Sequence, residues 1–312
     1  MAWQPIVAGV DGSPESFRAA SLAWRIARAA DARCVLVYAV PEVWAPGGMA
    51  PLVNSADIFD RLVSDLREQL AREVGAEVPE AVRQALVARA GRPGVVLDEI
   101  VREQGASLVV VGGRHHGALA RGLGGSTAHH LVRTSSAPVL VVAAAGRAPQ
   151  RILVATDLFG AAGPTLSIAG RYADLLDAQI RAVHVVEPAK YPMVVPLSLD
   201  EGEFEARSRE EFERLVESEL SRVLPDDRVI RRGRPDEEIA EEVASWRADL
   251  VVVGSHGKGW IDRLLIGSTT ERLLNRLPTS LLVVPISKPA VKSPARAETR
   301  ARARRRKGTV VI

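Results

Sequence analysis

The sequence is poor in the features that mark several large classes of protein. Its 312 residues include a single cysteine, Cys34, so no disulfide can form within the chain. Aromatic residues make up only 4% of the chain, and no apolar run is long enough to cross a bilayer, which argues against an integral membrane protein. The first ten residues show neither a basic region nor a cleavage site, so we expect a cytoplasmic protein.

Catalytic signatures are also missing. The chain has no GxSxG or HExxH motif and no pair of acids placed across a loop. Cys34 stands at the start of an apolar stretch, which favours a packed, unreactive thiol over a redox sensor. The sequence therefore does not predict a dedicated enzyme.

The excess positive charge is confined to the C-terminus. The chain holds 41 Lys and Arg against 38 Asp and Glu, and residues 286–312 contain nine of the former and one of the latter, which leaves 32 and 37 elsewhere. The body is therefore acidic, with a net charge of −5. We expect residues 287–312 to form a disordered basic tail, because they lack apolar periodicity. Such a tail can attract polyanions, either nucleic acid or an anionic membrane.

The chain repeats itself. Leu250–Pro285, which begins LVVVGSHGKG, aligns with Leu108–Val142, which begins LVVVGGRHHG, at an offset of 142 residues. Pro5–Ser13 aligns with Arg151–Phe159 at an offset of 146. This pattern indicates an internal duplication, with one domain over residues 1–145 and a second over residues 151–286.

Strand-length apolar runs alternate with amphipathic helical stretches in both halves. This alternation predicts an α/β protein made of two doubly wound, Rossmann-like domains in tandem, each with a five-stranded parallel sheet. In the first half we expect the third strand over Val82–Ala88, between helices over Ala56–Val74 and Pro93–Gln104. Ligands of such folds bind beyond the carboxyl ends of the strands, where the strand order reverses.

A glycine-rich loop joins a strand to a helix in the second half. Gly254, Gly257, Gly267 and Ser268 follow the spacing G-x2-G-x9-G-[ST]. Glycines let backbone amides approach a ligand closely, and the start of a helix offers unpaired N–H groups and the positive end of the helix dipole. The loop is neither a Walker loop nor a GxGxxG dinucleotide motif, yet its chemistry suits a polyphosphate.

On these motifs each half resembles a universal stress protein domain, and residues 3–286 are similar to a tandem universal stress protein. The ATP-binding branch of that family has the same glycine spacing, an aspartate at the end of the first strand and a small hydrophobic residue at the end of the second. The resemblance implies a regulatory binding module of the stress response that holds ATP, with or without Mg²⁺. It implies nucleotide contacts from Thr156, Asp157, Val185, Gly254, His256, Gly257, Gly267, Ser268 and Thr269 in the second half, and from Asp11, Ala39, Gly112, Gly125, Ser126 and Thr127 in the first.

Alternative interpretations stay open at this stage. His115 replaces the second glycine of the first-half loop, and its Cβ can tilt that loop away from phosphates. Asp157 can instead act only as a helix cap. A slow ATP-hydrolysing enzyme and a nucleotide-free, partner-binding scaffold are the two rival functions. A metal held by the histidine pairs is not expected, because no carboxylate or thiolate completes the set formed by His115, His116, His129 and His130.

The last strand of each half predicts how the halves assemble. Val139–Val142 and Leu281–Val284 would be unpaired sheet edges unless something covers them. In the family such strands pair across a two-fold axis, so we expect the two halves to pair with each other within the chain. A homodimer of whole chains is a further possibility, and the regulated protein partner is not identifiable from the sequence.

Overall fold

A computed structural model describes residues 3–40, 56–113, 127–143, 148–158, 162–187, 201–220, 222–255 and 266–285. The first half contains β1 (Ile6–Gly9), α1 (Pro14–Ala29), β2 (Cys34–Val40), α2 (Ala56–Val74), α3 (Glu80–Gln84), β3 (Val87–Ala90), α4 (Pro93–Gln104), β4 (Leu108–Gly112), α5 (Thr127–Thr134) and β5 (Val139–Val142). The second half contains β6 (Arg151–Thr156), α6 (Ala162–Leu176), β7 (Gln179–Val186), α7 (Glu201–Glu219), a short 3₁₀ helix (Pro225–Asp227), β8 (Arg228–Arg232), α8 (Pro235–Trp246), β9 (Leu250–Gly254), α9 (Ser268–Arg276) and β10 (Ser280–Val284).

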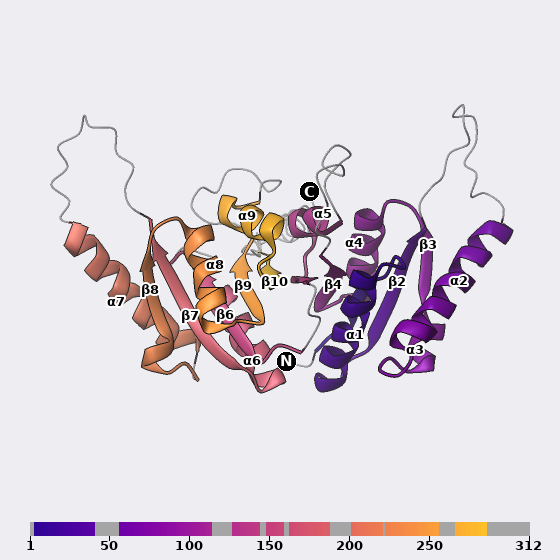
Figure 1. The fold of residues 1–312 in the computed structure, drawn as a ribbon, viewed down its shortest axis with the longest axis horizontal. Coiled ribbons are helices and arrows are strands. Elements are labelled where there is room, and N and C mark those ends of the chain that lie inside the picture. Colours follow the sequence, from indigo (N-terminus) through magenta and orange to yellow (C-terminus); the bar gives the residue numbers. More distant parts are fainter. Residues whose placement is uncertain are drawn as a thin grey trace, which may run out of the picture.

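The two halves share one ten-stranded sheet with the order β3-β2-β1-β4-β5-β10-β9-β6-β7-β8 (Figure 1). Within each half all neighbouring strands are parallel, which confirms the expected doubly wound α/β fold. The fifth strands β5 and β10 meet antiparallel, with Leu282 opposite Leu140. The predicted pairing of these two strands is therefore confirmed, and each strand covers an edge that the other would leave open.

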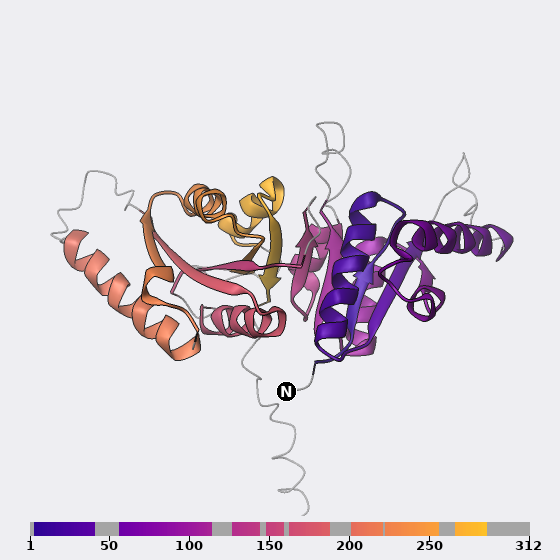
Figure 2. The same cartoon turned by 60° about the horizontal axis from the view of Figure 1, so that its bottom comes forward.

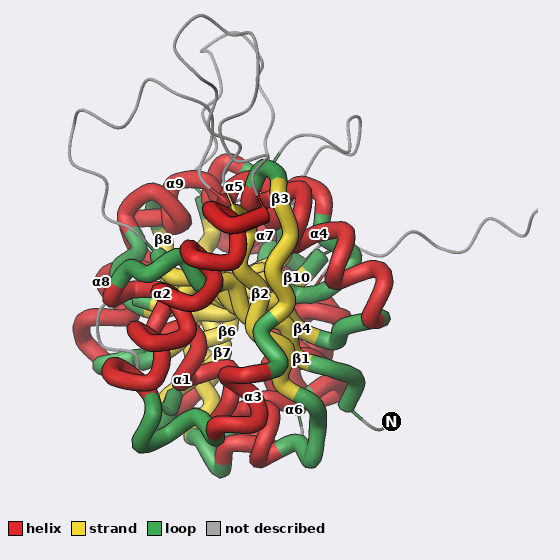
Figure 3. The backbone as a smooth tube through the Cα atoms, turned by 90° about the vertical axis from the view of Figure 1, so that its right-hand side faces the viewer, coloured by secondary structure: helices red, strands yellow, loops and turns green. Residues whose placement is uncertain are grey.

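Helices cover both faces of the sheet (Figures 2 and 3). Side chains alternate between the faces along each strand, so that in β4 Val110 joins a core with α1, α2, α6 and α7 while Val109 joins a core with α4, α5, α8 and α9. Each of these two cores runs through both halves. A strand buried on both faces needs apolar residues throughout, which explains the uninterrupted LVVV runs of the sequence.

The duplication extends to unusual backbone conformations. Asp31 and Asp177 both adopt a left-handed conformation, with φ of 50° and 49°, within two residues of the ends of α1 and α6. Gly105 (φ 58°) after α4 and Arg247 (φ 55°) after α8 do the same. These pairs lie at the offsets of 146 and 142 residues that align the two halves of the sequence. The repeat is thus preserved in local geometry even where the residue type has changed.

The expected third strand was partly wrong. Residues 80–84 form α3, and β3 begins only at Val87. The apolar residues Val78, Val82 and Leu86 are four residues apart, a helical spacing that does not alternate as a half-buried strand would. Val82 N–H donates to the Pro79 carbonyl at 3.1 Å, as expected for the first turn of a short helix.

Contacts beside the central strand pair also join the two halves. The Ala143 N–H donates to Ser280 Oγ at 3.1 Å. At the start of the chain, the Trp3 ring packs edge-on against Tyr172 of α6, with the ring centroids 5.1 Å apart. The Arg171 guanidinium lies 4.5 Å from the centre of the same Trp3 ring. These contacts tie the N-terminal segment of the first half to the second half.

Candidate functional site

Three neighbouring strands of the second half end at the same edge of the sheet. β6 lies between β7 and β9, with Thr156 opposite His184 and Val154 opposite Val252. Because the strands are parallel, their carboxyl ends lie together, and the strand order reverses between β6 and β9. Thr156 is the last residue of β6 and Gly254 is the last residue of β9. Each lies two residues after the pair Val154 and Val252, so the two strand ends lie side by side.

The end of β6 is held by its own polar groups and by β7. The Thr156 carbonyl accepts a hydrogen bond from His184 Nδ1 at 2.8 Å, which fixes the proton on that nitrogen. The Thr156 hydroxyl accepts a hydrogen bond from the Leu158 N–H at 3.3 Å. Between these residues Asp157 is half-buried. Leu158 adopts φ of 63°, a left-handed conformation that Gly12 provides at the equivalent point of the first half. A strained non-glycine residue therefore directly follows the candidate aspartate.

Two hydrogen bonds tie together the ends of the glycine-rich loop. Thr270 Oγ1 donates to the Gly254 carbonyl at 2.8 Å, and the Gly267 N–H donates to the Ser255 carbonyl at 2.9 Å. Thr270 is buried in the first turn of α9, and Gly254 is the last residue of β9. The start of α9 is thereby fastened to the end of β9, next to the end of β6.

The first turn of α9 has polar backbone groups available for a ligand. Its N-cap residue is Gly267, and within the described part of the chain no side chain caps this helix. Ser268 is exposed and Thr269 is half-buried. Uncapped N–H groups and the positive dipole end make such a helix start attractive to anions. A ligand anion here would lie at the strand edge that Asp157 also borders.

Val185 lies one residue before the end of β7 and is half-buried. Its backbone pairs with Arg231 of the edge strand β8. The Arg231 guanidinium bonds to Glu242 at 2.7 Å and to Glu238 at 3.2 Å, both on α8. The expected adenine-contacting residue is therefore flanked by a guanidinium that is already neutralised.

In the first half, the carboxylate of Asp11 takes part in the local turn. Asp11 is exposed and accepts hydrogen bonds from the N–H of Ser13 at 3.0 Å and from its hydroxyl at 2.5 Å. Ser13 in turn caps α1 by accepting from the Ser16 N–H. Burial, and secondly the charge of Asp11, raise the pKa of Tyr38 above its usual value. Asp11 thus organises the start of α1 and lies near a phenol.

The other first-half candidates that the structure describes are more buried. Ala39 is 7% exposed in β2, and Thr127 is the first, half-buried residue of α5. Gly112 ends β4, and a Cβ there would come within 2.7 Å of the Glu15 backbone in α1. The packing of α1 against β4 therefore requires a glycine at this position, whether or not a ligand binds.

Several predicted positions lie outside the described residues. They are the second-half residues His256 and Gly257, the first-half residues Gly125, Ser126, His115 and His116, and the tail 287–312. The described edges of both loops consist of strand ends and helix starts. The structure therefore brings together Thr156, Asp157, Val185, Gly254, Gly267, Ser268 and Thr269 along one edge, and it leaves the middle of each glycine loop undescribed.

The two described histidines of α5 face different neighbours. His129 interacts with Glu271 and Asn275 of α9, and burial, followed by the charge of Arg133, lowers the pKa of His129. A Cβ at Gly94 of α4 would meet the His130 ring at 2.7 Å, so that ring packs on α4. Over the part of the chain that the structure describes, no three His, Cys, Asp or Glu side chains converge as a metal site would require.

The sequence prediction missed three residues near these strand ends, namely His184 and Thr270 in the second half and Tyr38 in the first. His184 is a buried polar residue in the apolar strand sequence AVHVV, and Tyr38 stands at the equivalent point of the first half. A polar residue at this point of both copies was an available signal. Thr270 could not be found this way, because its first-half equivalent is Ala128.

Burial raises the pKa of the Cys34 thiol to about 12, so the thiol is protonated at neutral pH, in line with a packed thiol.

Among the helices of the described residues, none is both long enough and apolar enough to cross a bilayer.

Known proteins with similar sequences agree with the duplication. The model of the universal stress protein family matches residues 2–143 and again residues 149–285. A universal stress protein of Mycobacterium tuberculosis is 30% identical over 295 residues, covering 89% of this chain and 96% of the relative. A second universal stress protein of that species is 31% identical over 310 residues, covering 92% and 96% respectively.

Solved structures agree on the fold. A protein of unknown function from Pseudomonas aeruginosa aligns with a TM-score of 0.60 at 18% identity, covering 91% of this chain and 93% of that one. A universal stress protein from Archaeoglobus fulgidus aligns with a TM-score of 0.58 at 20% identity, covering 90% and 98%. A universal stress protein solved in complex with cAMP is 26% identical over 46% of this chain and 98% of that chain, with a TM-score of 0.33. With its family model matched twice in tandem and relatives that align over most of its length, this chain belongs to the universal stress protein family.

Proposed function

We propose that the second half binds an adenine nucleotide, with ATP as the expected ligand, at the carboxyl edge of β6, β7 and β9. The observation that carries the proposal is the fastening of the uncapped start of α9 to the end of β9 through Thr270 and Gly267. The start of α9, which no described side chain caps, therefore lies beside the strand edge where the order reverses. Residues with this chemistry fit a phosphate chain.

In this proposal each part of the edge contacts one part of the nucleotide. Gly254, His256, Gly257, Gly267, Ser268 and Thr269 surround the phosphates, with backbone amides and hydroxyls as donors. Thr156 and Asp157 bind the adenosine part, and the backbone of Val185 contacts adenine. Mg²⁺ would arrive with the phosphates, since that ion is commonly held by substrate phosphates and only one or two carboxylates.

The proposed biological role is binding-dependent regulation within a stress response, in the cytoplasm. No general base is evident among the described residues of the edge, since Asp157 is assigned to the adenosine part and His184 is held by Thr156. We therefore expect hydrolysis to be slow or absent. Phosphate release under excess ATP measures this directly, and a turnover of roughly 1 per second or more would identify an enzyme instead.

The first half is proposed as a weaker site, built from Asp11, Ala39, Gly112, Gly125, Ser126 and Thr127. His115 replaces the second loop glycine. Ala128 stands at the position of Thr270, so the hydroxyl that fastens the second-half loop has no counterpart there. These differences favour preferential nucleotide binding by the second half.

The experiment that tests the proposal is identification of the nucleotide that the purified full chain retains. The protein is denatured, and the released small molecules are identified by mass. An adenine nucleotide supports the proposal. If no nucleotide is retained and added ATP gives no saturable binding, the chain is the nucleotide-free scaffold of the alternative interpretation, and the proposal is wrong.

A further inference from the structure

The central strand pair lies on a pseudo-two-fold axis that relates the two halves. Leu140 and Leu282 are equivalent residues of the repeat, 142 positions apart, and they lie opposite each other in the antiparallel pair of β5 and β10. The flanking residue pairs of the two strands are symmetric about them. Contacts around this axis therefore show whether each half fits only the other half or would fit a second copy of itself equally well.

The helices α5 and α9 carry complementary polar groups beside the axis. His129 of α5 is the repeat equivalent of Glu271 of α9, and the two residues interact, so they also lie next to the axis. His129 forms a side-chain hydrogen bond with Asn275, whose equivalent in α5 is Arg133. One helix thus contributes a histidine and an arginine, and the other contributes a carboxylate and an amide.

Pairing of like halves would lose this complementarity. Two first halves would bring together two copies of His129 and of Arg133, and α5 has no carboxylate to offset them. Two second halves would bring two copies of Glu271 together. Like charges in contact disfavour a wrong partner, whereas opposite charges help to select the right one. The contact between α5 and α9 therefore favours unlike halves.

The shape of the interface makes the same distinction. Leu277, the left-handed residue that ends α9, lies against Gly113 directly after β4, and a Cβ at position 113 would collide with Leu277 Cδ2. The repeat places Ser255 at the position of Gly113 and Ser135 at the position of Leu277. Two second halves would therefore set the Cβ of Ser255 against Leu277. Two first halves would leave Gly113 without the leucine that covers it.

One buried hydrogen bond is also available only to unlike halves. The Ala143 N–H donates to Ser280 Oγ at 3.1 Å, and both residues are buried. Their repeat equivalents are Pro285 and Pro138. Two first halves would leave the Ala143 N–H facing Pro138, which has no hydroxyl, and two second halves would set Ser280 opposite Pro285, which has no N–H. An unsatisfied buried donor or acceptor destabilises an interface.

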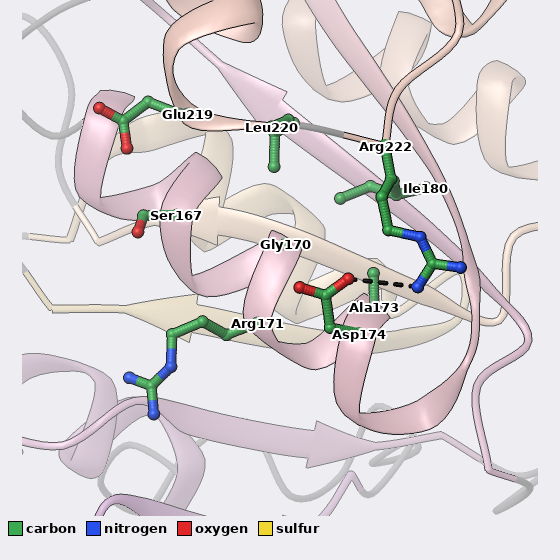
Figure 4. Close-up of a pocket in the computed structure, with 9 residues that line it drawn as sticks. All are labelled: Ser167, Gly170, Arg171, Ala173, Asp174, Ile180, Glu219, Leu220 and Arg222. Atoms are coloured by element: carbon green, nitrogen blue, oxygen red, sulfur yellow. Dashed lines mark hydrogen bonds and ion pairs between the residues drawn. The ribbon is translucent and has the colours of Figure 1, made fainter. Parts of the chain in front are cut away.

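The other face of the sheet has an unlike contact as well. Trp3 of the first half packs edge-on against Tyr172 and beneath the Arg171 guanidinium, both on α6. Figure 4 shows the Arg171 side chain directed away from Asp174 of the same helix. At the offset of 146 residues, the equivalent of Trp3 is Pro149, so two second halves would have no aromatic ring to place against this helix.

Charge, shape and hydrogen bonding thus disfavour like halves in the same way. We propose that the interface between the halves is heterospecific: each half recognises the other and discriminates against a second copy of itself. The first half is synthesised before the second, so this discrimination keeps completed first halves of neighbouring chains from pairing. Every assembled unit then carries one glycine loop with the complete spacing, including Gly257, and one with His115 in that place. The inference does not depend on nucleotide binding.

The test removes the tether, which otherwise favours internal pairing through its high effective concentration. A protease site inserted after Gly146 is cut in the folded full-length protein, and the nicked protein is unfolded in urea and refolded. Native mass spectrometry then separates mixed pairs from the two kinds of like pair, because the halves differ in mass. Mixed pairs should exceed like pairs by about tenfold or more.

Two other outcomes of this experiment would overturn the proposal. Equal amounts of mixed and like pairs, which is the result of random pairing, would show that the interface does not discriminate. Halves that no longer pair after refolding would show that the linker, and not recognition at the interface, holds them together.

Variants of the nicked protein test the polar pair beside the axis. His129→Glu places two carboxylates together in the mixed pair, so the excess of mixed pairs should fall by about tenfold. Adding Glu271→His exchanges the two residues and should restore the excess. If His129→Glu does not refold, the double variant His129→Gln with Glu271→Gln makes like and unlike contacts equal and should lower the excess by about threefold. An unchanged excess in the folded variant contradicts the proposed discrimination by these residues.

Discussion

The hydroxyl of Thr270 offers the sharpest test of how the loop is prepared for its ligand. Thr270→Val keeps the shape of this buried side chain and removes the 2.8 Å hydrogen bond to the Gly254 carbonyl. One such bond contributes about 1 kcal/mol to the free energy of unfolding. Without this bond the start of α9 is less ordered until ATP binds, so ATP binding must supply the energy of ordering it. Binding then weakens by up to about 1 kcal/mol, which raises the Kd for ATP by about fivefold.

Thr279→Val provides the matched control. Thr279 Oγ1 donates to the Asp249 carbonyl, also at 2.8 Å, but it does so at the amino end of β9. Both variants should therefore lower the free energy of unfolding in urea by about 1 kcal/mol. Calorimetric titration with ATP should show weaker binding only for Thr270→Val. Equal ATP affinities in the two variants would refute the view that this bond prepares the phosphate site.

Three further predictions concern stability and the tail. Asp236 is fully buried and forms ion pairs with Arg272 at 3.2 Å and with Arg234 at 3.4 Å. Asp236→Leu should therefore lower the free energy of unfolding in urea by about 2 kcal/mol. A loss of less than about 0.5 kcal/mol would contradict this expectation. The pKa of His129 is lowered on folding, so its stabilising contribution is present above about pH 6.5 and is lost as the pH falls through the folded value. Thermal unfolding of wild type against His129→Gln checks this, and a wild-type advantage that grows on acidification would contradict it. Truncation after Ser287 should leave ATP affinity unchanged and remove salt-sensitive DNA retention, because the basic charge lies in the tail; loss of ATP binding, or DNA retention that survives, would show the reasoning to be wrong.

Much of the fold was accessible from the sequence because apolar periodicity and the duplication agreed. The bounds of α2, α4 and β5 were predicted to the residue, and β10 begins one residue earlier than predicted, a difference that is usual for element ends. The prediction of the third strand failed because Val82 and Leu86, which are four residues apart, were interpreted as part of an extended run. The short α3 depends on local bonding to the Pro79 carbonyl, which periodicity alone does not reveal.

The candidate site was less predictable. Strand ends and the helix start at Gly267 follow from the pattern, since parallel strands bring their carboxyl ends together. The hydrogen bonds of His184 and Thr270 depend on register between segments far apart in the sequence. Leu158 illustrates the same limit. A left-handed backbone conformation is predicted from sequence mainly at glycine or asparagine, and Leu158 adopts it although it is neither. These positions depend on tertiary contacts and not on local propensity.

The most direct test of the central claim is calorimetric titration of ATP into the full-length wild type and Gly257→Val. Gly257 is the second glycine of the loop spacing, and a branched side chain there would obstruct close approach of the backbone to phosphates. Saturable ATP binding by wild type, weakened at least tenfold in a variant with an unchanged circular dichroism spectrum, is the predicted result. Equal ATP affinity in both folded proteins would contradict the assignment of this loop to the phosphates.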